Sequence, residues 1–243
     1  MVYKSKKQLK KLSDKQFFED IKKYIKSYHS FYESRVPELK VLANRLHEEY
    51  DLKEFYKVFN KFWNSGYNEE RTLAVHTLQL YKEDFDINTW RFLKPKLKDI
   101  KSWDKVDRVS SNIIGEILVR ERKLEKEIIA LAKSNNIWFK RMAIMATVPL
   151  IKLNNNELSL QICEFFIHDK DKQIQEAVGL ILREIGEQKP AVAKKFILKN
   201  IHMPILSFDI ATQNMKELRK LRDVKKLGRE TSIVKSIKNI FRR

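Results

Sequence analysis

Apolar residues recur at the spacing of one helix face along most of the chain. The first such segment carries Phe17, Ile21, Tyr24, Ile25 and Tyr28, a spacing that is typical of a helix with one buried side. Comparable segments follow one another to about residue 223, and Asn, Asp and Gly repeatedly occupy the breaks between them. No stretch alternates apolar and polar residues for long enough to predict a strand. The pattern therefore predicts an all-α protein of roughly a dozen helices joined by short turns.

Internal repetition distinguishes a helical bundle from a stack of helix pairs. The segments LAVHTLQ, DRVSSNI, RMAIMAT and QEAVGLI align on small or branched apolar residues that are 34 residues apart: Val75, Val109, Ala143 and Ala177. The breaks before these segments have the same spacing: Asn68, Ser102, Asn136 and Lys170. A repeat of this length that contains two helices is typical of HEAT-like units. We therefore predict a right-handed α-solenoid in which the second helix of each pair lines a concave face.

Polar residues also follow this register. Asp107, Arg141 and Gln175 lie 34 residues apart, and equivalent positions of stacked helices are roughly 10 Å apart. The repeat before them has Leu73 at the same position, so the polar stripe begins at Asp107. One interpretation is that the stripe faces a groove. The alternative is that Asp107 and Arg141 form an ion pair between repeats, and periodicity alone leaves both open.

The positive charge is concentrated at the two ends of the chain. The formal net charge is +18, of which residues 1–15 carry +5 and residues 219–243 carry +8. Basic arms of this kind suit a polyanion such as nucleic acid, although solvated tails or an anionic membrane surface would also explain them. We expect a basic N-terminal arm at 1–14, a repeat solenoid at 15–223 and a basic C-terminal tail at 224–243.

Several classes of protein and site are not supported. A single cysteine, Cys163, allows no internal disulfide, no apolar run is long enough for a membrane span, and the basic N-terminus lacks the apolar core of a secretory signal. We therefore expect a cytoplasmic protein with no membrane partner. The sequence has no phosphate-binding loop, nucleophile elbow or C-x-x-C pair, and its five histidines are scattered. No metal site is predicted.

Trp103 and Asp107 are one helical turn apart and should project from one helix face. A tryptophan at such a position is commonly a core residue. However, an aromatic face beside a carboxylate also suits a cation that develops on a sugar. A carboxylate about 4 Å from such a cation contributes on the order of 4 kcal/mol at an effective dielectric near 20, or roughly a thousandfold in rate.

Four segments resemble one known family. KSWDKVD (101–107), NNIWFKR (135–141), AVGLILRE (177–184) and YIKSYHSFYESRVPE (24–38) are similar to segments of the AlkD-like DNA alkylation-repair glycosylases, which are built from HEAT-like repeats. The resemblance covers most of residues 15–215. It implies removal of positively charged N3- or N7-alkylated purines from double-stranded DNA that lies in the concave groove. It also implies that no metal or organic cofactor is needed, and we expect a monomer.

The resemblance implies roles for individual residues. Asp107 matches the catalytic carboxylate that stabilises the sugar cation and orients water, and Trp103 matches the aromatic residue beside the lesion sugar. Arg141 matches an arginine that holds the DNA backbone near the lesion. The other residues expected to contact DNA are Tyr24, Trp138, Lys105 and Arg183.

The chain also departs from the family pattern. The family commonly has a second groove tryptophan where this sequence has Leu180, so one aromatic wall is missing. Asp209 stands where basic character is usual. Two alternatives therefore accompany the glycosylase interpretation. One is a DNA-structure binder of the same superfamily that does not excise bases, and the other is a HEAT-like scaffold that binds proteins.

Overall fold

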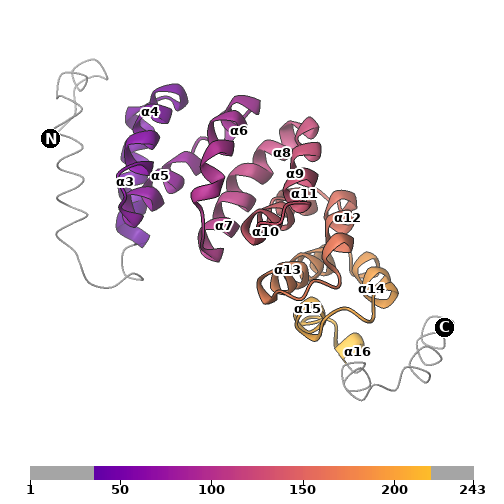
Figure 1. Cartoon of the computed structure of the whole chain (residues 1–243). Coiled ribbons are helices and arrows are strands. Elements are labelled where there is room, and N and C mark those ends of the chain that lie inside the picture. Colours follow the sequence, from indigo (N-terminus) through magenta and orange to yellow (C-terminus); the bar gives the residue numbers. More distant parts are fainter. Residues whose placement is uncertain (1–35, 220–243) are drawn as a thin grey trace. The chain divides into compact units, whose positions relative to one another are not determined.

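The computed structural model describes residues 36–219 of the chain (Figure 1). Within this range every regular element is helical and none is a strand, which confirms the predicted all-α class. The chain divides into two compact units, Met1–Asp84 and Phe85–Arg243. The predicted boundaries near residues 14 and 223, both basic arms and Tyr24 lie outside the described residues, so the domain boundaries stay predictions.

The described part of the first unit contains three α-helices. These are α3 (Val36–Glu49), α4 (Leu52–Trp63) and α5 (Asn68–Gln79), followed by the short 3-10 helix η1 (Lys82–Asp84). Asp51 caps α4 by accepting a hydrogen bond from the amide of Glu54. The α5 helix packs against α3 and α4, and on α4 the ring of Phe59 contacts the rings of Phe55 and Trp63.

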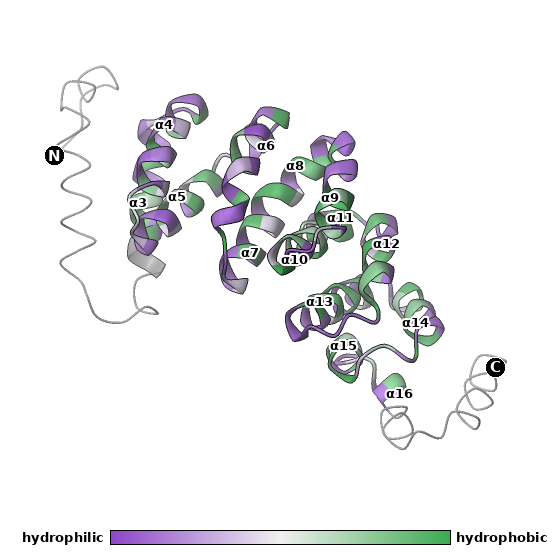
Figure 2. Ribbon diagram, viewed as in Figure 1, coloured by the Kyte–Doolittle hydropathy of each residue, from purple (hydrophilic) through white to green (hydrophobic). Residues whose placement is uncertain are grey.

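The second unit contains the longer series of helices. In chain order they are α6 (Ile87–Leu93), η2 (Lys94–Asp99), α7 (Trp103–Val109), η3 (Ser110–Ile114), α8 (Gly115–Arg120), η4 (Arg122–Leu124), α9 (Glu125–Ala132), α10 (Ile137–Met145), α11 (Val148–Lys152), α12 (Glu157–Phe166), α13 (Lys172–Gln188), α14 (Pro190–Lys199), α15 (Ile205–Ala211) and α16 (Lys216–Arg219). Most of these ribbons carry both hydrophobic and hydrophilic residues (Figure 2), as expected of helices with one buried face.

Helices of the second unit pack in sequence order. α7 contacts α10, α10 contacts α13, and α13 contacts α15, while α9 lies against α10 and α12 against α13. This succession of packed helix pairs is consistent with the predicted α-solenoid. Its right-handed sense and its concave DNA-binding groove stay predictions.

The predicted repeat register agrees with the buried positions. Val109, Ala143 and Ala177 are completely buried, as residues of an inter-helix seam should be. Asn136 caps α10 by accepting hydrogen bonds from the amides of Trp138 and Phe139. Two predicted breaks are displaced by one residue, because α5 begins at Asn68 after Tyr67, and Asp171 rather than Lys170 caps α13.

The helix that begins at Trp103 continues without a break to Arg120, but its middle is wider than an α-helix. Residues Ser110–Ile114 form a single π-helical segment, η3, between α7 and α8. Gly115 follows, and a Cβ atom added there would lie 2.6 Å from the carbonyl oxygen of Ala146 and from the ring of Pro149. Glycine thus permits the close approach of this helix to the α10–α11 junction.

Candidate functional site

Trp103 and Asp107 both lie on α7. Ser102 precedes the helix in an extended conformation and its side chain makes no capping hydrogen bond. Trp103 is the first helical residue, and 57% of its surface is exposed. Trp103 is therefore a surface residue and not part of the hydrophobic core. Asp107 follows one turn later on the same helix face, with 19% of its side chain exposed.

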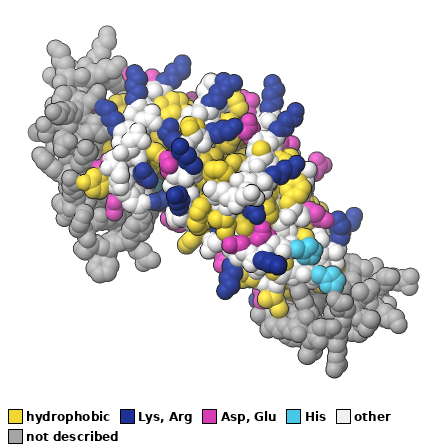
Figure 3. Space-filling view, in the orientation of Figure 1, with side chains coloured by type: hydrophobic (Ala, Val, Ile, Leu, Met, Phe, Trp, Pro, Cys, Tyr) yellow, Lys and Arg dark blue, Asp and Glu magenta, His cyan; other side chains and the backbone are white. Residues whose placement is uncertain are grey.

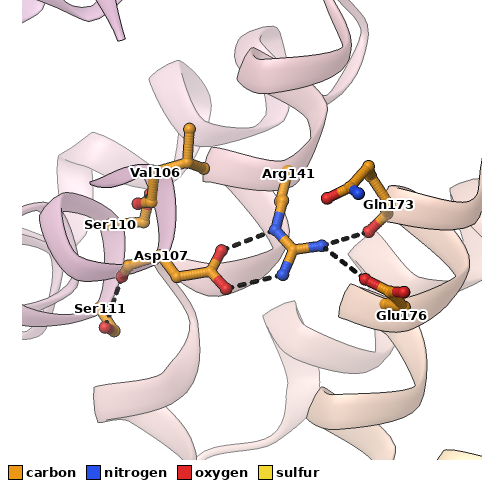
Figure 4. A network of polar contacts seen from close by, with 7 residues as sticks. All are labelled: Val106, Asp107, Ser110, Ser111, Arg141, Gln173 and Glu176. Atoms are coloured by element: carbon orange, nitrogen blue, oxygen red, sulfur yellow. Dashed lines mark hydrogen bonds and ion pairs between the residues drawn. The ribbon is translucent and has the colours of Figure 1, made fainter. Parts of the chain in front are cut away.

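Asp107 and Arg141 form a two-point ion pair between neighbouring helices. Arg141 lies on α10, and its Nε and Nη2 atoms donate to Oδ1 and Oδ2 of Asp107, each over 2.7 Å (Figure 4). Only 2% of the arginine side chain is exposed. This geometry orients both carboxylate oxygens at once. It is the ion pair between repeats, which is one of the two interpretations of the polar stripe.

The other edge of the Arg141 guanidinium faces α13. Its Nη1 atom donates to the backbone carbonyl of Gln173 and lies 3.8 Å from Oε2 of Glu176 (Figure 4). The arginine is thus held between a carboxylate from α7 and a carboxylate from α13. Because an arginine remains charged even when buried, this group of three side chains carries one positive and two negative charges.

Two serine hydroxyls bond the backbone beside Asp107. Ser110 donates to the carbonyl of Val106, and Ser111 donates to the carbonyl of Asp107, each over 2.6 Å. Both serines begin η3 (Figure 4). Their hydroxyls therefore supply partners for carbonyls at the point where the hydrogen-bonding pattern changes from α to π. Asp107 thus lies in the last turn of α7, just ahead of the π-helical segment.

The predicted polar stripe changes at its third member. Gln175 donates its side-chain amide to the carbonyl of Asp169 over 3.0 Å, whereas Gln173 and Glu176 are the α13 residues that meet Arg141. The 34-residue spacing leads to Gln175 and does not point to Glu176. The available signal was the carboxylate beside Gln175, since a buried arginine between two helices needs acceptors from both.

The other residues predicted to contact DNA occupy separate places. Lys105 is half-buried on α7, and Trp138 is half-buried in the first turn of α10. Arg183 on α13 donates to the side chain of Gln213 over 2.8 Å and keeps 32% of its side chain exposed. Their roles with DNA stay predictions. The family resemblance implies a DNA contact for Arg141, but in the described arrangement its guanidinium bonds Asp107 and the Gln173 carbonyl.

Leu180 lies one turn after Glu176 on α13 and is half-buried. It therefore presents an aliphatic side chain on the helix face that also carries Glu176. The described residues contain no group of three or more His, Cys, Asp or Glu side chains that could hold a metal ion. Burial raises the pKa of the Cys163 thiol well above its usual range, as expected of a structural cysteine.

Surface charge in the described residues is mixed. In the space-filling view, Lys and Arg side chains are spread over the visible face and are interspersed with Asp and Glu (Figure 3). Some of these lysines are paired, such as Lys140 with Asp169 at 3.4 Å and Lys94 with Glu127 at 2.8 Å. Among the described residues, no helix is both long and apolar enough to cross a membrane.

These observations define an all-helical repeat protein with an exposed tryptophan and a carboxylate that a buried arginine orients. The family model for the DNA alkylation repair enzymes matches residues 5–215. The chain belongs to this family. No curated protein sequence matches it significantly.

Solved structures show the same fold. A predicted DNA alkylation repair enzyme from Enterococcus faecalis is 17% identical with a TM-score of 0.65, and the match covers 74% of this chain and 85% of that one. AlkD2 from Streptococcus mutans is 18% identical with a TM-score of 0.62, and the match covers 84% of this chain and 100% of that one. At these identities the likeness concerns the fold.

Proposed function

We propose that this protein is a DNA glycosylase that excises positively charged N3- or N7-alkylated purines from double-stranded DNA. The observation that carries the proposal is the pairing of Trp103 and Asp107 on one face of α7. The tryptophan is exposed, and the carboxylate is partly exposed while both its oxygens are oriented by Arg141. Membership in the DNA alkylation repair family supports the same reaction class.

The proposed chemistry uses the charge of the leaving base. An alkylated purine that is already cationic departs with the electron pair of the N-glycosidic bond and becomes neutral, so no acid is needed to protonate it. The positive charge then develops on the sugar. Asp107 stabilises that charge and orients the water that adds to C1′, and the water proton is released to solvent. Trp103 packs beside the sugar and offers its ring face to the cation.

The remaining residues of the proposal bind DNA or support the site. Arg141 acts through Asp107 by holding both carboxylate oxygens in place. Lys105 and Arg183 contact phosphates, which makes affinity depend on salt, and Trp138 lies at the DNA interface. No metal or organic cofactor takes part, and the partner is duplex DNA bound by a monomer in the cytoplasm.

Release of 7-methylguanine or 3-methyladenine from methylated duplex DNA tests the proposal. We expect time-dependent release of the free base and accumulation of abasic sites that alkali cleaves. Salt-dependent duplex binding without base release would instead identify a DNA-structure binder of the same superfamily, which the aliphatic Leu180 favours as the second candidate. Absence of salt-dependent duplex binding would indicate a protein-binding scaffold.

A further inference from the structure

Glu176 gives the Asp107 site a second negative charge. Its carboxylate lies on α13, is 41% exposed, and faces Nη1 of Arg141 at 3.8 Å. Asp107 faces the opposite edge of the same guanidinium at 2.7 Å. Figure 4 shows the arginine between the two carboxylates. An Asp107–Arg141 pair alone would be electrically neutral, whereas the three side chains together carry one net negative charge.

This net charge matters for any ligand that meets Asp107. A cation near a neutral ion pair is attracted by the carboxylate and repelled by the guanidinium just behind it. A second carboxylate behind the guanidinium offsets part of that repulsion. Arg141 cannot relieve it by losing a proton, because an arginine remains protonated in proteins. The nearby Lys140 is already paired with Asp169 at 3.4 Å.

The same residue also helps to fix the arginine. The Gln173 carbonyl and Glu176 both belong to the first turns of α13 and hold the Nη1 edge. The Nε and Nη2 atoms are thereby turned toward Asp107. Contacts from α13 therefore align a carboxylate on α7, although the two helices contribute to the site from opposite sides of α10.

We propose that Glu176 is a positioning residue that acts through Arg141 and makes the Asp107 site selective for a cationic group. The proposal rests on the proposed function, because the cation it serves there is the sugar at the moment of bond cleavage. It assigns to Glu176 no contact with DNA. Glu176 preserves the electrostatic attraction between Asp107 and a positive charge, while Arg141 keeps the Asp107 carboxylate aligned.

Binding to two abasic-site mimics tests the charge effect directly. One duplex carries a pyrrolidine, which is cationic at neutral pH, and the other carries a neutral tetrahydrofuran. The wild-type protein should prefer the cationic duplex, and Glu176→Gln should reduce that preference by about three- to tenfold. Glu176→Asp keeps the charge and should retain most of the preference. Glu184→Gln is the matched control, because it removes the same charge two turns later on α13 and should leave the preference unchanged.

The results separate this role from structural support. Glu176 is substantially exposed, so Glu176→Gln should melt near the wild type, and its kcat for base excision should fall while its KM for methylated duplex stays unchanged. An unaltered cation preference in Glu176→Gln, or an equal loss in Glu184→Gln, overturns the proposal, as does a wild type that binds both mimics equally. A wild type that excises no base but prefers the cationic duplex, with a preference that Glu176→Gln reduces, overturns the proposed function instead and leaves the charge effect of Glu176 supported.

Discussion

The carboxylate of Asp107 meets the guanidinium of Arg141 edge to edge, with both donor–acceptor distances at 2.7 Å. The arginine is buried, and the aspartate keeps 19% of its side chain exposed. The pair therefore has a fixed inner member and an accessible outer member. Such an arrangement is suited to present a carboxylate of defined orientation to a ligand.

Asp107→Asn should reduce base excision by about a hundredfold or more, because the amide retains the shape of the carboxyl group but lacks its charge. Binding to undamaged duplex should persist, since the aspartate is not a phosphate ligand. Release of 7-methylguanine under single-turnover conditions measures the first effect, and a duplex-binding titration measures the second. Excision at the wild-type rate would rule out the catalytic role of Asp107.

Arg141→Lys should destabilise the fold by about 2 kcal/mol, because an ammonium group cannot bond both oxygens of Asp107 and the Gln173 carbonyl in the same geometry. Urea unfolding monitored by circular dichroism gives the change in free energy. A variant as stable as the wild type would show that the pair contributes orientation alone.

The salt dependence of DNA binding separates two roles of Arg141. The slope of log K against log salt is negative, and removing a residue that contacts phosphate makes it shallower by about 0.9. Because Arg141 is buried, we expect Arg141→Met to leave that slope unchanged while it reduces excision. Arg183→Met is the comparison, since Arg183 is 32% exposed and its loss should make the slope shallower. A shallower slope in Arg141→Met would instead support the direct DNA contact that the family resemblance implies.

Much of this arrangement could be predicted from the sequence because it depends on spacing. The 34-residue register brought Asp107 beside Arg141 and placed Val109, Ala143 and Ala177 in the core. Spacing could not identify Glu176, because side-chain direction on a helix shifts when the helix shifts by a fraction of a turn. The displaced cap at Asp171 is one such local shift. On the same helix, Gln173 and Glu176 meet Arg141 and Gln175 does not.

The π-helical turn also cannot be predicted from the sequence. Nothing in SSNIIG distinguishes a π segment from a regular helix by apolar spacing alone. The exposure of Trp103 likewise depends on what packs against the start of α7, which is a tertiary property. The sequence therefore predicted which residues lie together more securely than which of them face solvent.

Gly115→Ala should destabilise the protein by about 1–3 kcal/mol. The new methyl group would lie 2.6 Å from the backbone oxygen of Ala146 and from the Pro149 ring, and neither is the end of a flexible side chain. The effect is a shift of the urea midpoint with little change in m-value. Gly66→Ala should also destabilise the protein, but through backbone strain rather than a steric clash. Gly66 has open space around it and a positive φ of 83°.

Asp86 should make stability depend on pH. Burial alone would raise the pKa of its carboxyl group, but hydrogen bonds from Thr89 and Asn88 outweigh burial and lower that pKa overall. A carboxyl with a lowered pKa in the folded state stabilises the fold above its unfolded pKa of about 3.9. The contribution is lost as pH falls through the folded value.

Asp86→Asn isolates this contribution, because asparagine can still cap α6 but does not titrate in this range. The variant should be less stable than the wild type at pH 7, and the difference should shrink as pH falls below about 4. Thermal unfolding across this pH range checks the result. A difference that stays constant with pH would mean that the cap acts through its geometry alone.

Trp103→Ala should leave stability within about 0.5 kcal/mol of the wild type, because the side chain is 57% exposed and surface substitutions away from special features have small effects. Base excision should nevertheless fall by about tenfold, the expected loss of one aromatic contact with the sugar and its developing charge. Trp103→Phe should keep part of the activity, since it retains a smaller ring face. Phe165→Ala is the matched control, because Phe165 is an exposed aromatic residue on α12 at 48% and lies outside the proposed site. Equal losses of excision in Trp103→Ala and Phe165→Ala would show that exposed aromatic surface in general, rather than the place of Trp103 beside Asp107, supports the reaction.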